Sequence, residues 1–372
     1  MIVSLPYTVS KKFQRRLIIR GRIQSEKIAV KGKEVFVGID VHKESWQVTV
    51  RTEGEEVFHG RIPGQNPALQ KILERFRGSE MKVAYEAGPF GFGLHDQLRE
   101  DGIEVIVVPP SLIPMESGNR VKTDKRDSRK LARLLESNML KRVYVLSEED
   151  RADRELLRTR RQVLEHRSDV ARQIKSKLLF HGISSPLATE RWTKGYIRWL
   201  RELTWGSKVL KVSFESLIEL YEYLTEHLIK INQEVIELSR SRKYLHKVKL
   251  LKSVPGIGTL VGMELLVELS EMERFRSADE LASYIGVTPS EYSTGQYVRQ
   301  GRITRCGNKR VRTCLVESSW ILIQKDPLMR LKYNQLKQFK GAKRAIIAIA
   351  RKLIIRIRRL LLNNEPYVIG VC

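Results

Sequence analysis

The sequence predicts an α/β domain with a mixed sheet, followed by a long helical region and a mainly helical C-terminal domain. Three observations support this fold class. Short segments of alternating hydrophobicity dominate the first third of the chain, long charged helices almost without Gly or Pro follow, and a Gly-rich turn between helical segments appears later. The 372 residues are enough for two or three domains.

Changes in composition divide the chain into four predicted segments. Residues 1–33 are rich in Lys and Arg and weakly patterned, which indicates a basic extension that is flexible or orders only on a partner. The sheet domain is expected at 34–146, a helical coiled-coil region at 147–249 and the C-terminal domain at 250–372.

In the sheet domain, β-branched and aromatic residues mark the strands, and polar residues such as those of Glu53-Gly54 mark the turns. Three successive strands predict an antiparallel meander, and alternating helices and strands then predict a mixed sheet flanked by helices. The expected elements are strands at 35–40, 46–50 and 57–62, a helix at 68–76, a strand at 82–86, a helix at 91–99 and a strand at 104–108.

Four acidic residues occur where these patterns stop. Asp40 ends the strand VFVGID, Glu86 ends the strand MKVAYE, and Asp124 and Asp127 precede the periodic leucines of KTDKRDSRKLARLL. Asp124 and Asp127, three residues apart, project from one face of a helix and can converge on a single point. Hard oxygen ligands in that number suit Mg²⁺ or Mn²⁺, and two such ions could serve a phosphoryl transfer.

The helical region contains a heptad pattern, which indicates a coiled coil. Its apolar positions alternate spacings of three and four: Phe214, Leu217, Tyr221, Leu224, Leu228, Ile231, Val235 and Leu238. The helix before it is a poorer match, with Leu157, Leu164, Ala171, Ile174 and Leu178. Pairing within one chain and pairing between subunits both fit the pattern. The arginines of that first helix form either a solvated face or a phosphate-contacting face: Arg158, Arg160, Arg161, Arg167 and Arg172.

The C-terminal domain begins with a possible helix-hairpin-helix. Gly256 and Gly258 follow a proline between two helical segments, and backbone amides at such a turn can hold a DNA phosphate. A loop rich in Gly, Ser, Thr and Arg comes next, and hydroxyl groups beside guanidinium groups suggest a nucleophile near a phosphodiester. The residues concerned are Ser290, Ser293, Thr294, Arg299, Arg302 and Arg305.

The charge of the chain indicates a polyanionic partner. A formal net charge of +25 with a sequence pI near 10 opposes compaction, and nucleic acid is the expected partner, with strongly salt-dependent binding.

The cysteines Cys306, Cys314 and Cys372 form no CxxC pair and are expected to be free thiols in a reducing cytoplasm. No apolar run approaches a membrane span, so a soluble cytoplasmic protein is expected. The basic, apolar segment 343–362 is expected to pack on the C-terminal domain rather than on a membrane surface.

Several ordered motifs resemble one family. They are GIDVHKESWQVTV, YEAGPFGFGLHDQL, VKTDKRDSRKLARLL, SVPGIG, PSEYSTGQYVRQGRITRCGNKRVR and ARKLIIRIRRLLLNNEPY. The chain is similar over residues 35–367 to the DEDD transposases of the insertion sequence one-ten family, in the branch with the EYSTG motif. The resemblance implies a RuvC-like N-terminal domain of ribonuclease H fold, a coiled coil and a C-terminal transposase domain with an essential serine.

The same resemblance implies the site. Asp40, Glu86, Asp124 and Asp127 match the family's metal-binding tetrad, and the serine falls at Ser293, with Thr294 as the alternative. The implied mechanism is attack of the serine on a phosphodiester to form a 5′-phosphoserine link, with the acids and Mg²⁺ activating it in a composite site. Double-stranded DNA of element ends and target, a structured guide RNA and a homo-oligomer, dimer or tetramer, are the implied partners.

Two other functions fit part of the pattern. A RuvC-type junction nuclease would use the acids alone to activate water, and its C-terminal half would only bind DNA. A non-catalytic nucleic-acid scaffold would use the acids only to balance neighbouring basic residues. Replacing Ser293 with Ala separates the transposase from the nuclease, which requires cleavage to survive. Activity that survives substitution of Asp40 would remove the metal mechanism, and tight binding with no cleavage under any condition would favour the scaffold.

Overall fold

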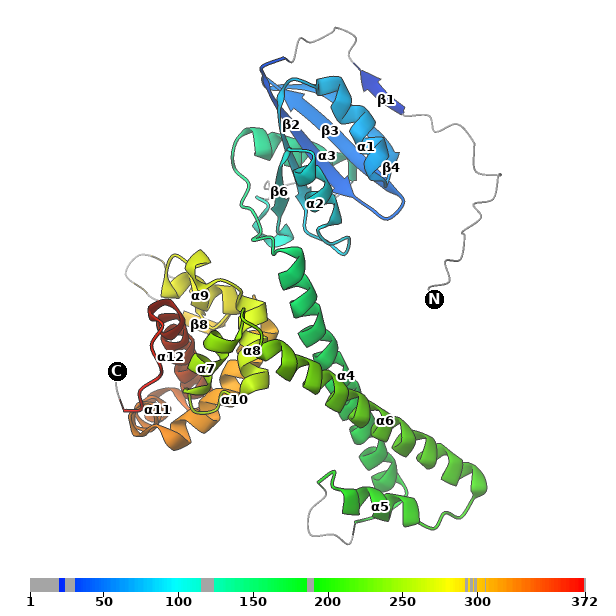
Figure 1. Cartoon of the computed structure of the whole chain (residues 1–372), viewed down its shortest axis with the longest axis vertical. Coiled ribbons are helices and arrows are strands. Elements are labelled where there is room, and N and C mark those ends of the chain that lie inside the picture. Colours follow the sequence, from blue (N-terminus) through cyan, green and yellow to red (C-terminus); the bar gives the residue numbers. More distant parts are fainter. Residues whose placement is uncertain are drawn as a thin grey trace. The chain divides into compact units, whose positions relative to one another are not determined.

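The computed structural model describes residues 20–23, 31–114, 124–185, 191–291, 294, 297, 300–304 and 306–370. Contacts divide the chain into two compact units, residues 1–145 and 146–372 (Figure 1). The first unit is a sheet with helices on both faces, and the second is helical apart from one short hairpin. An α/β domain followed by a helical C-terminal region is therefore confirmed.

The sheet of the first unit has six strands in the order β1-β4-β3-β2-β5-β6. Their bounds are β1 (Arg20–Ile23), β2 (Glu34–Val41), β3 (Ser45–Thr52), β4 (Glu55–Pro63), β5 (Glu80–Glu86) and β6 (Glu104–Val108). Strands β2, β3 and β4 form the predicted antiparallel meander, whereas β5 and β6 run parallel to β2. Strand β1 pairs antiparallel with β4 at the edge of the sheet, in a segment where the sequence pattern predicted no strand.

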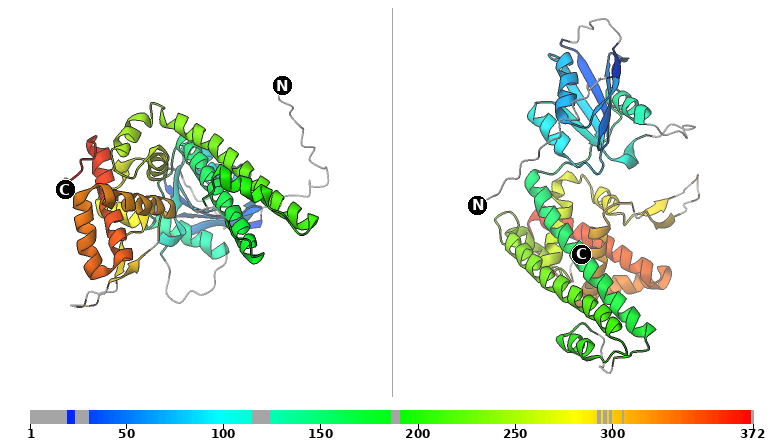
Figure 2. Two further views of the ribbon diagram at one scale, coloured as in Figure 1. Left: turned by 90° about the horizontal axis from the view of Figure 1, so that it is seen from below. Right: turned by 90° about the vertical axis from the view of Figure 1, so that its right-hand side faces the viewer.

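Helices cover both faces of this sheet (Figure 2). One face carries α1 (Asn66–Leu73) and α2 (Gly93–Glu100), whose Leu69, Ile72 and Leu98 are fully buried against the strands. The other face carries α3 (Asp124–Glu136). Short 3-10 turns lie at Glu74–Phe76 and Pro110–Leu112. The strands are therefore buried on both sides, as expected for the centre of a mixed sheet.

Five of the eight residues of the predicted heptad seam are buried within the chain, and Leu217, Leu224 and Leu238 are half-buried. Helix α4 (Glu148–Phe180) packs against α6 (Lys208–Ser239), and α5 (Lys194–Glu202) lies beside them in the same apolar cluster (Figure 1). The pair is antiparallel, because Arg160 bonds to Asn232 whereas Lys177, further along α4, bonds to Ser213. The two helices therefore pair within one chain, and pairing between subunits stays a prediction.

The remaining helices enclose one large core. They are α7 (Leu245–Lys252), α8 (Thr259–Leu269), α9 (Ala278–Ile285), α10 (Lys309–Lys325), α11 (Pro327–Lys340) and α12 (Ala342–Asn363), with a hairpin of β7 (Pro289–Glu291) and β8 (Gln300–Ile303) and a 3-10 turn at Met272–Arg274. Leu157 of α4 and Ile231 and Val235 of α6 belong to the same core, so the α4–α6 pair and the C-terminal helices pack as one unit. The predicted packing of the last helix is confirmed, because Ile346, Leu353 and six other residues of α12 are buried there.

Two further expectations concern membrane-spanning segments and the state of the cysteines. Within the described ranges, no helix is long and apolar enough to cross a membrane. Cys306 and Cys314 are free thiols, and Cys372 lies outside the described residues. Burial raises the pKa of the Cys314 thiol to about 12, so this thiol is protonated at neutral pH.

Candidate functional site

Two of the four predicted acids lie side by side at one edge of the sheet. Strands β2 and β5 are parallel neighbours, and their last registered pair is Ile39 with Tyr85. Asp40 and Glu86 are the next residue on each strand, so both follow the buried part of the sheet at its carboxyl edge. Residues two positions apart on a strand share a face, which places both acids on the face of Gly38 and Ala84.

Helix α3 covers that face and begins at the end of the sheet that carries the acids. Near its start, the Ser128 hydroxyl bonds at 2.9 Å to Thr49, the registered neighbour of Gly38. At its end, Glu136 accepts from Arg51, which pairs with Phe36 near the opposite end of β2. The helix is therefore antiparallel to β2, and its first turn, with Asp127, lies toward the end of β2 that carries Asp40.

Gly38 permits this approach. A Cβ at Gly38 would lie 2.2 Å from the carbonyl oxygen of Ser128 and 2.4 Å from the amide nitrogen of Ala132, which no side chain tolerates. Helix α3 thus packs directly on the backbone of β2. Sequence reasoning missed this glycine, although a glycine two residues before the strand-end Asp40 marks a close backbone contact.

A buried network of side-chain hydrogen bonds fixes the position of the start of α3, and the sequence analysis did not predict it. Thr49, fully buried, bonds through its hydroxyl to Ser128 and to Nδ1 of His59, both at 2.9 Å. A buried hydroxyl group that loses its hydrogen-bond partner destabilises the fold. These hydrogen bonds therefore favour a single position of α3 on the sheet. The detectable signal is a threonine in the otherwise apolar centre of β3.

The donor chemistry of the acidic edge fits a hard divalent cation. Asp40, whose side chain is 14% exposed, has its Oδ2 3.1 Å from Nε2 of His42. Asp127 is half-buried, and the side chain of Asp124 lies outside the described residues although α3 begins there. Among the side chains that are described, no three His, Cys, Asp or Glu residues lie close enough to hold a metal ion. The residues that would do so are carboxylates, the ligands that Mg²⁺ and Mn²⁺ prefer.

The two predicted glycines of the second unit differ in their surroundings. Gly256 has φ +92°, and a Cβ there would lie 2.7 Å from the carbonyl oxygen of Ser318 on α10. Its own carbonyl accepts from the Ser318 hydroxyl at 3.0 Å. Gly258 is exposed at the start of α8, and a Cβ there would meet no atom within 4 Å. Gly256 therefore packs the turn on α10, and Gly258 is the position open to a ligand.

The predicted serine and two of its arginines, Ser293, Arg299 and Arg305, lie outside the described residues. Of their neighbours, Thr294 and Arg302 are exposed on the β7–β8 hairpin. Thr294 and Tyr297 exchange backbone hydrogen bonds of 3.1–3.2 Å. The hydroxyl of Ser290 donates to the carbonyl of Arg302 at 3.1 Å, so that serine is engaged in holding the strands together.

A buried carboxylate anchors the end of this loop, and sequence reasoning did not find it. Glu268 of α8 is 1% exposed and accepts two hydrogen bonds from Arg158 of α4, at 2.9 and 3.1 Å. It also accepts from the side chain of Asn308 at 2.8 Å. Asn308 caps α10, and its backbone amide bonds to Tyr284 of α9. Glu268 therefore ties α4 to the residue that ends the loop of the predicted serine.

One turn before Glu268, the carboxylate of Glu264 is also buried. Burial raises the pKa of Glu264, and the nearby Arg161 and Arg160 oppose this shift. Its Oε1 has no hydrogen-bond partner within the part of the chain that is described. Two acids four residues apart in the apolar helix LVGMELLVEL thus face the basic side of α4.

Sequence profiles of two families match the chain. One is described as a transposase and matches residues 37–182, which include all four acids. The other is described as the Transposase IS116/IS110/IS902 family and matches residues 248–334, which include the glycine turn and the β7–β8 hairpin.

Individual proteins match over most of the length. A putative transposase y4qE of Sinorhizobium fredii is 31% identical over 359 residues, covering 93% of this chain and 88% of that protein. The transposase for insertion sequence element IS1533 of Leptospira borgpetersenii is 26% identical over 346 residues, covering 90% and 97%. A pilin gene-inverting protein of Moraxella bovis is 32% identical over 125 residues, covering 33% and 39%.

Proposed function

The chain belongs to the IS116/IS110/IS902 family of transposases, and from this premise we propose that it excises and integrates an insertion sequence by cutting and rejoining double-stranded DNA. The enzyme is a DNA transposase. The observation that carries the proposed chemistry is the placing of Asp40 and Glu86 on one edge of the sheet, with the first turn of α3 directed toward them. A pilin gene-inverting protein among the relatives fits a reaction in which strands are both cut and rejoined.

The proposal assigns the first unit to the RuvC-like branch of the ribonuclease H fold. Support comes from the antiparallel meander followed by two parallel strands, with helices on both faces. Support also comes from the position of the acids, at the ends of adjacent strands and on the helix that follows. Asp40, Glu86, Asp124 and Asp127 would then hold Mg²⁺ or Mn²⁺. A bound cation would stabilise negative charge on the oxygens of the phosphodiester.

Ser293 is the proposed nucleophile, with Thr294 as the alternative. Its Oγ attacks the phosphorus of the scissile phosphodiester and loses its proton, forming an Oγ–P bond. The bond from phosphorus to the 3′ oxygen breaks, and that oxygen leaves as a hydroxyl group. The product is a 5′-phosphoserine, from which another strand's 3′ hydroxyl can recover a phosphodiester without hydrolysis. The exposed hairpin around Thr294 suits access by DNA.

The DNA contacts assigned to the second unit are the amides at Gly258 and the guanidinium groups of Arg299, Arg302 and Arg305. The exposed Gly258 and Arg302 support this, whereas Gly256 shapes the turn by packing on α10. A structured guide RNA is also proposed, and the net charge of +25 supports it. The proposed homo-oligomer, dimer or tetramer, follows from the resemblance to the family alone.

Replacing Asp40 with Asn tests the acidic site. We expect cleavage of DNA carrying the element ends to fall by more than about 100-fold, because even indirect partners of metal ligands contribute about 10- to 100-fold. We also expect Mg²⁺ to raise the thermal midpoint of the wild-type protein but not that of Asp40→Asn, since only the former binds the ion tightly. Cleavage rates and thermal unfolding with and without Mg²⁺ measure both.

Asp101→Asn is the matched control, since Asp101 lies at the end of α2 and bonds to Gln70. Both of its readouts should equal those of the wild type. Undiminished cleavage by Asp40→Asn, or wild-type cleavage in EDTA, would remove the metal mechanism. Tight DNA binding without cleavage under any condition would favour the scaffold.

A further inference from the structure

The structure separates into two groups the five arginines of α4 that the sequence analysis named. Three of them are engaged within the second unit: Arg158 with Glu268, Arg160 with Asn232, and Arg161 with Glu165. The other two, Arg167 and Arg172, lie further along the helix. Arg167 lies over the ring of Tyr221, and Arg172 is exposed and paired with its neighbour Asp169. The phosphate-contacting face considered from the sequence is therefore restricted to this part of α4.

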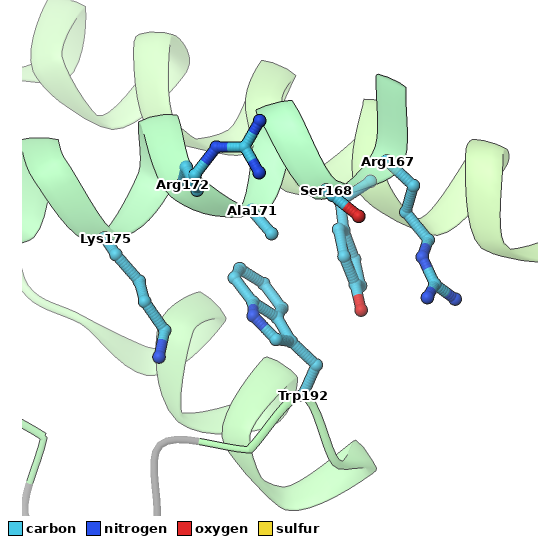
Figure 3. A pocket seen from close by; sticks show the side chains of 7 residues that line it. Arg167, Ser168, Ala171, Arg172, Lys175 and Trp192 are labelled. Carbon is cyan, nitrogen blue, oxygen red and sulfur yellow. The ribbon is translucent and has the colours of Figure 1, made fainter. Parts of the chain in front are cut away.

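Arg167 and Arg172 border a pocket of about 310 Å³ between α4, the segment before α5, and α6 (Figure 3). Its lining consists of Arg167, Ser168, Ala171, Arg172, Lys175, Trp192 and Tyr221. The α4 residues recur at spacings of three and four, so they share one face of that helix. Among the described residues, three cations and no acidic side chain line the pocket.

The aromatic side chains of the pocket, Trp192 and Tyr221, pack against each other, and Trp192 also contacts Tyr196. Trp192 stacks on Tyr221 with ring centres 4.2 Å apart, and its edge meets Tyr196 at 5.3 Å. Tyr221 and Tyr196 are 5% and 1% exposed, whereas Trp192 is only half-buried. The pocket thus combines a packed aromatic floor, formed by Trp192, Tyr221 and Tyr196, with a basic rim of Arg167, Arg172 and Lys175. In Figure 3, Trp192 lies below Ala171, with Arg172 and Lys175 on one side and Arg167 on the other.

This combination suits one class of ligand. Aromatic side chains beside cations bind single-stranded nucleic acid, because bases stack on the rings and phosphates pair with the charges. A duplex cannot offer a base to such a pocket, since its bases are stacked and paired inside the helix. We propose that the pocket seats an unpaired nucleotide of a single-stranded segment, with the base against Trp192 and the phosphates near Arg167, Arg172 and Lys175. The inference rests on the proposed function, which brings nucleic acid to the protein.

The test compares binding of labelled single-stranded RNA, single-stranded DNA of the same sequence and the blunt DNA duplex to the full chain. Trp192→Leu keeps an apolar side chain but removes the stacking surface. We expect it to weaken single-strand binding by about tenfold and to leave duplex binding unchanged. If affinity falls for RNA alone or for DNA alone, that nucleic acid is the one that the pocket binds. If affinity falls for both, the pocket binds single strands of either kind.

Arg167→Gln and Lys175→Gln test the basic rim, and Arg167→Gln also removes the guanidinium group that lies over Tyr221. Each should lower the slope of log Kd against log salt for single strands by about 0.7, the value for one phosphate contact. Lys230→Gln, on the exposed side of α6, and Tyr223→Leu, an exposed aromatic there, are the controls and should change neither slope nor affinity.

The inference would be overturned if Trp192→Leu bound single strands within twofold of the wild-type affinity. It would also be overturned if this variant lost as much affinity for the duplex as for single strands. A Trp192→Leu protein with a wild-type thermal midpoint excludes misfolding as the cause, and the rim variants decide the question if it does not fold. Failure of the proposed function is distinguishable, because it would appear as a wild-type protein that cleaves no DNA.

Discussion

Gly38→Ala is expected to disable the enzyme and to destabilise its first unit. The added methyl would lie within 2.4 Å of two backbone atoms of α3, so the helix must move away from β2. Overpacking of this kind costs about 1–3 kcal/mol, and contact with backbone rather than with a flexible side chain favours the upper end. The movement would also carry Asp127 away from Asp40 and Glu86, and a misplacement of about 1 Å can reduce a rate about 100-fold.

Urea denaturation and DNA cleavage measure the two effects of Gly38→Ala. Gly93→Ala, at the start of α2, is the matched control because its methyl meets no atom within 4 Å. That variant should stay within about 0.5 kcal/mol of the wild type and cleave normally. A Gly38→Ala protein with wild-type stability and cleavage would show that α3 need not contact β2 for the acidic site to work.

Glu268→Gln should produce the largest loss of stability in the second unit. Removing one partner of a buried ion pair costs about 3–5 kcal/mol, and partial exposure of Arg158 favours the lower value. The variant also weakens the hold on Asn308, which ends the loop of the proposed nucleophile. We therefore expect single-turnover cleavage to fall by about tenfold or more while DNA affinity is unchanged.

The stability effect should depend on pH. Burial alone would raise the pKa of Glu268, but hydrogen bonds and charge from Arg158, together with Asn308, lower it below the ordinary value of 4.5. A carboxylate with a lowered folded-state pKa stabilises the protein above its unfolded pKa, and this contribution disappears as pH falls through the folded pKa. The difference between wild type and Glu268→Gln should thus be full at neutral pH and vanish in acid.

Glu165→Gln is the control for this ion pair. Glu165 also pairs with an arginine of α4, Arg161 at 3.0 Å, but its side chain is 60% exposed. Exposed pairs contribute less than about 1 kcal/mol, so this variant should unfold almost as the wild type does. Equal effects of the two substitutions would show that Glu268 is not a buried anchor.

The sheet was predictable from the sequence because its signals are local. Each strand from 35 to 108 had its own run of β-branched or aromatic residues, and parallel neighbours bring their final residues to one edge whatever their separation in the chain. The contact of Gly38 with α3 was not predicted, because it depends on how closely a helix that comes much later in the chain approaches the strand. Strand β1 was missed because its segment is weakly patterned and pairs only at an edge.

The buried ion pair of Glu268 in the second unit could not be predicted from the sequence. Glu264 and Glu268 interrupt an apolar helix at a spacing of four, which is typical of a solvent-exposed stripe. The arginine partner of Glu268 lies 110 residues earlier, and no local pattern connects the two. The useful signal was that α8 has no other polar side chain after Thr259, so a helix buried all round must bring its acids to cations.

The most direct test of the account is trapping of a covalent protein–DNA complex. The protein is incubated with DNA of the element ends, the RNA transcribed beside the gene and Mg²⁺, and the products are separated on a denaturing gel. We predict a slow covalent band that Ser293→Ala abolishes and that Thr294→Ala and Ser290→Ala retain. Loss with Thr294→Ala instead would reassign the nucleophile. Cleavage without any covalent band, unaffected by Ser293→Ala, would contradict serine recombination and favour the nuclease that activates water.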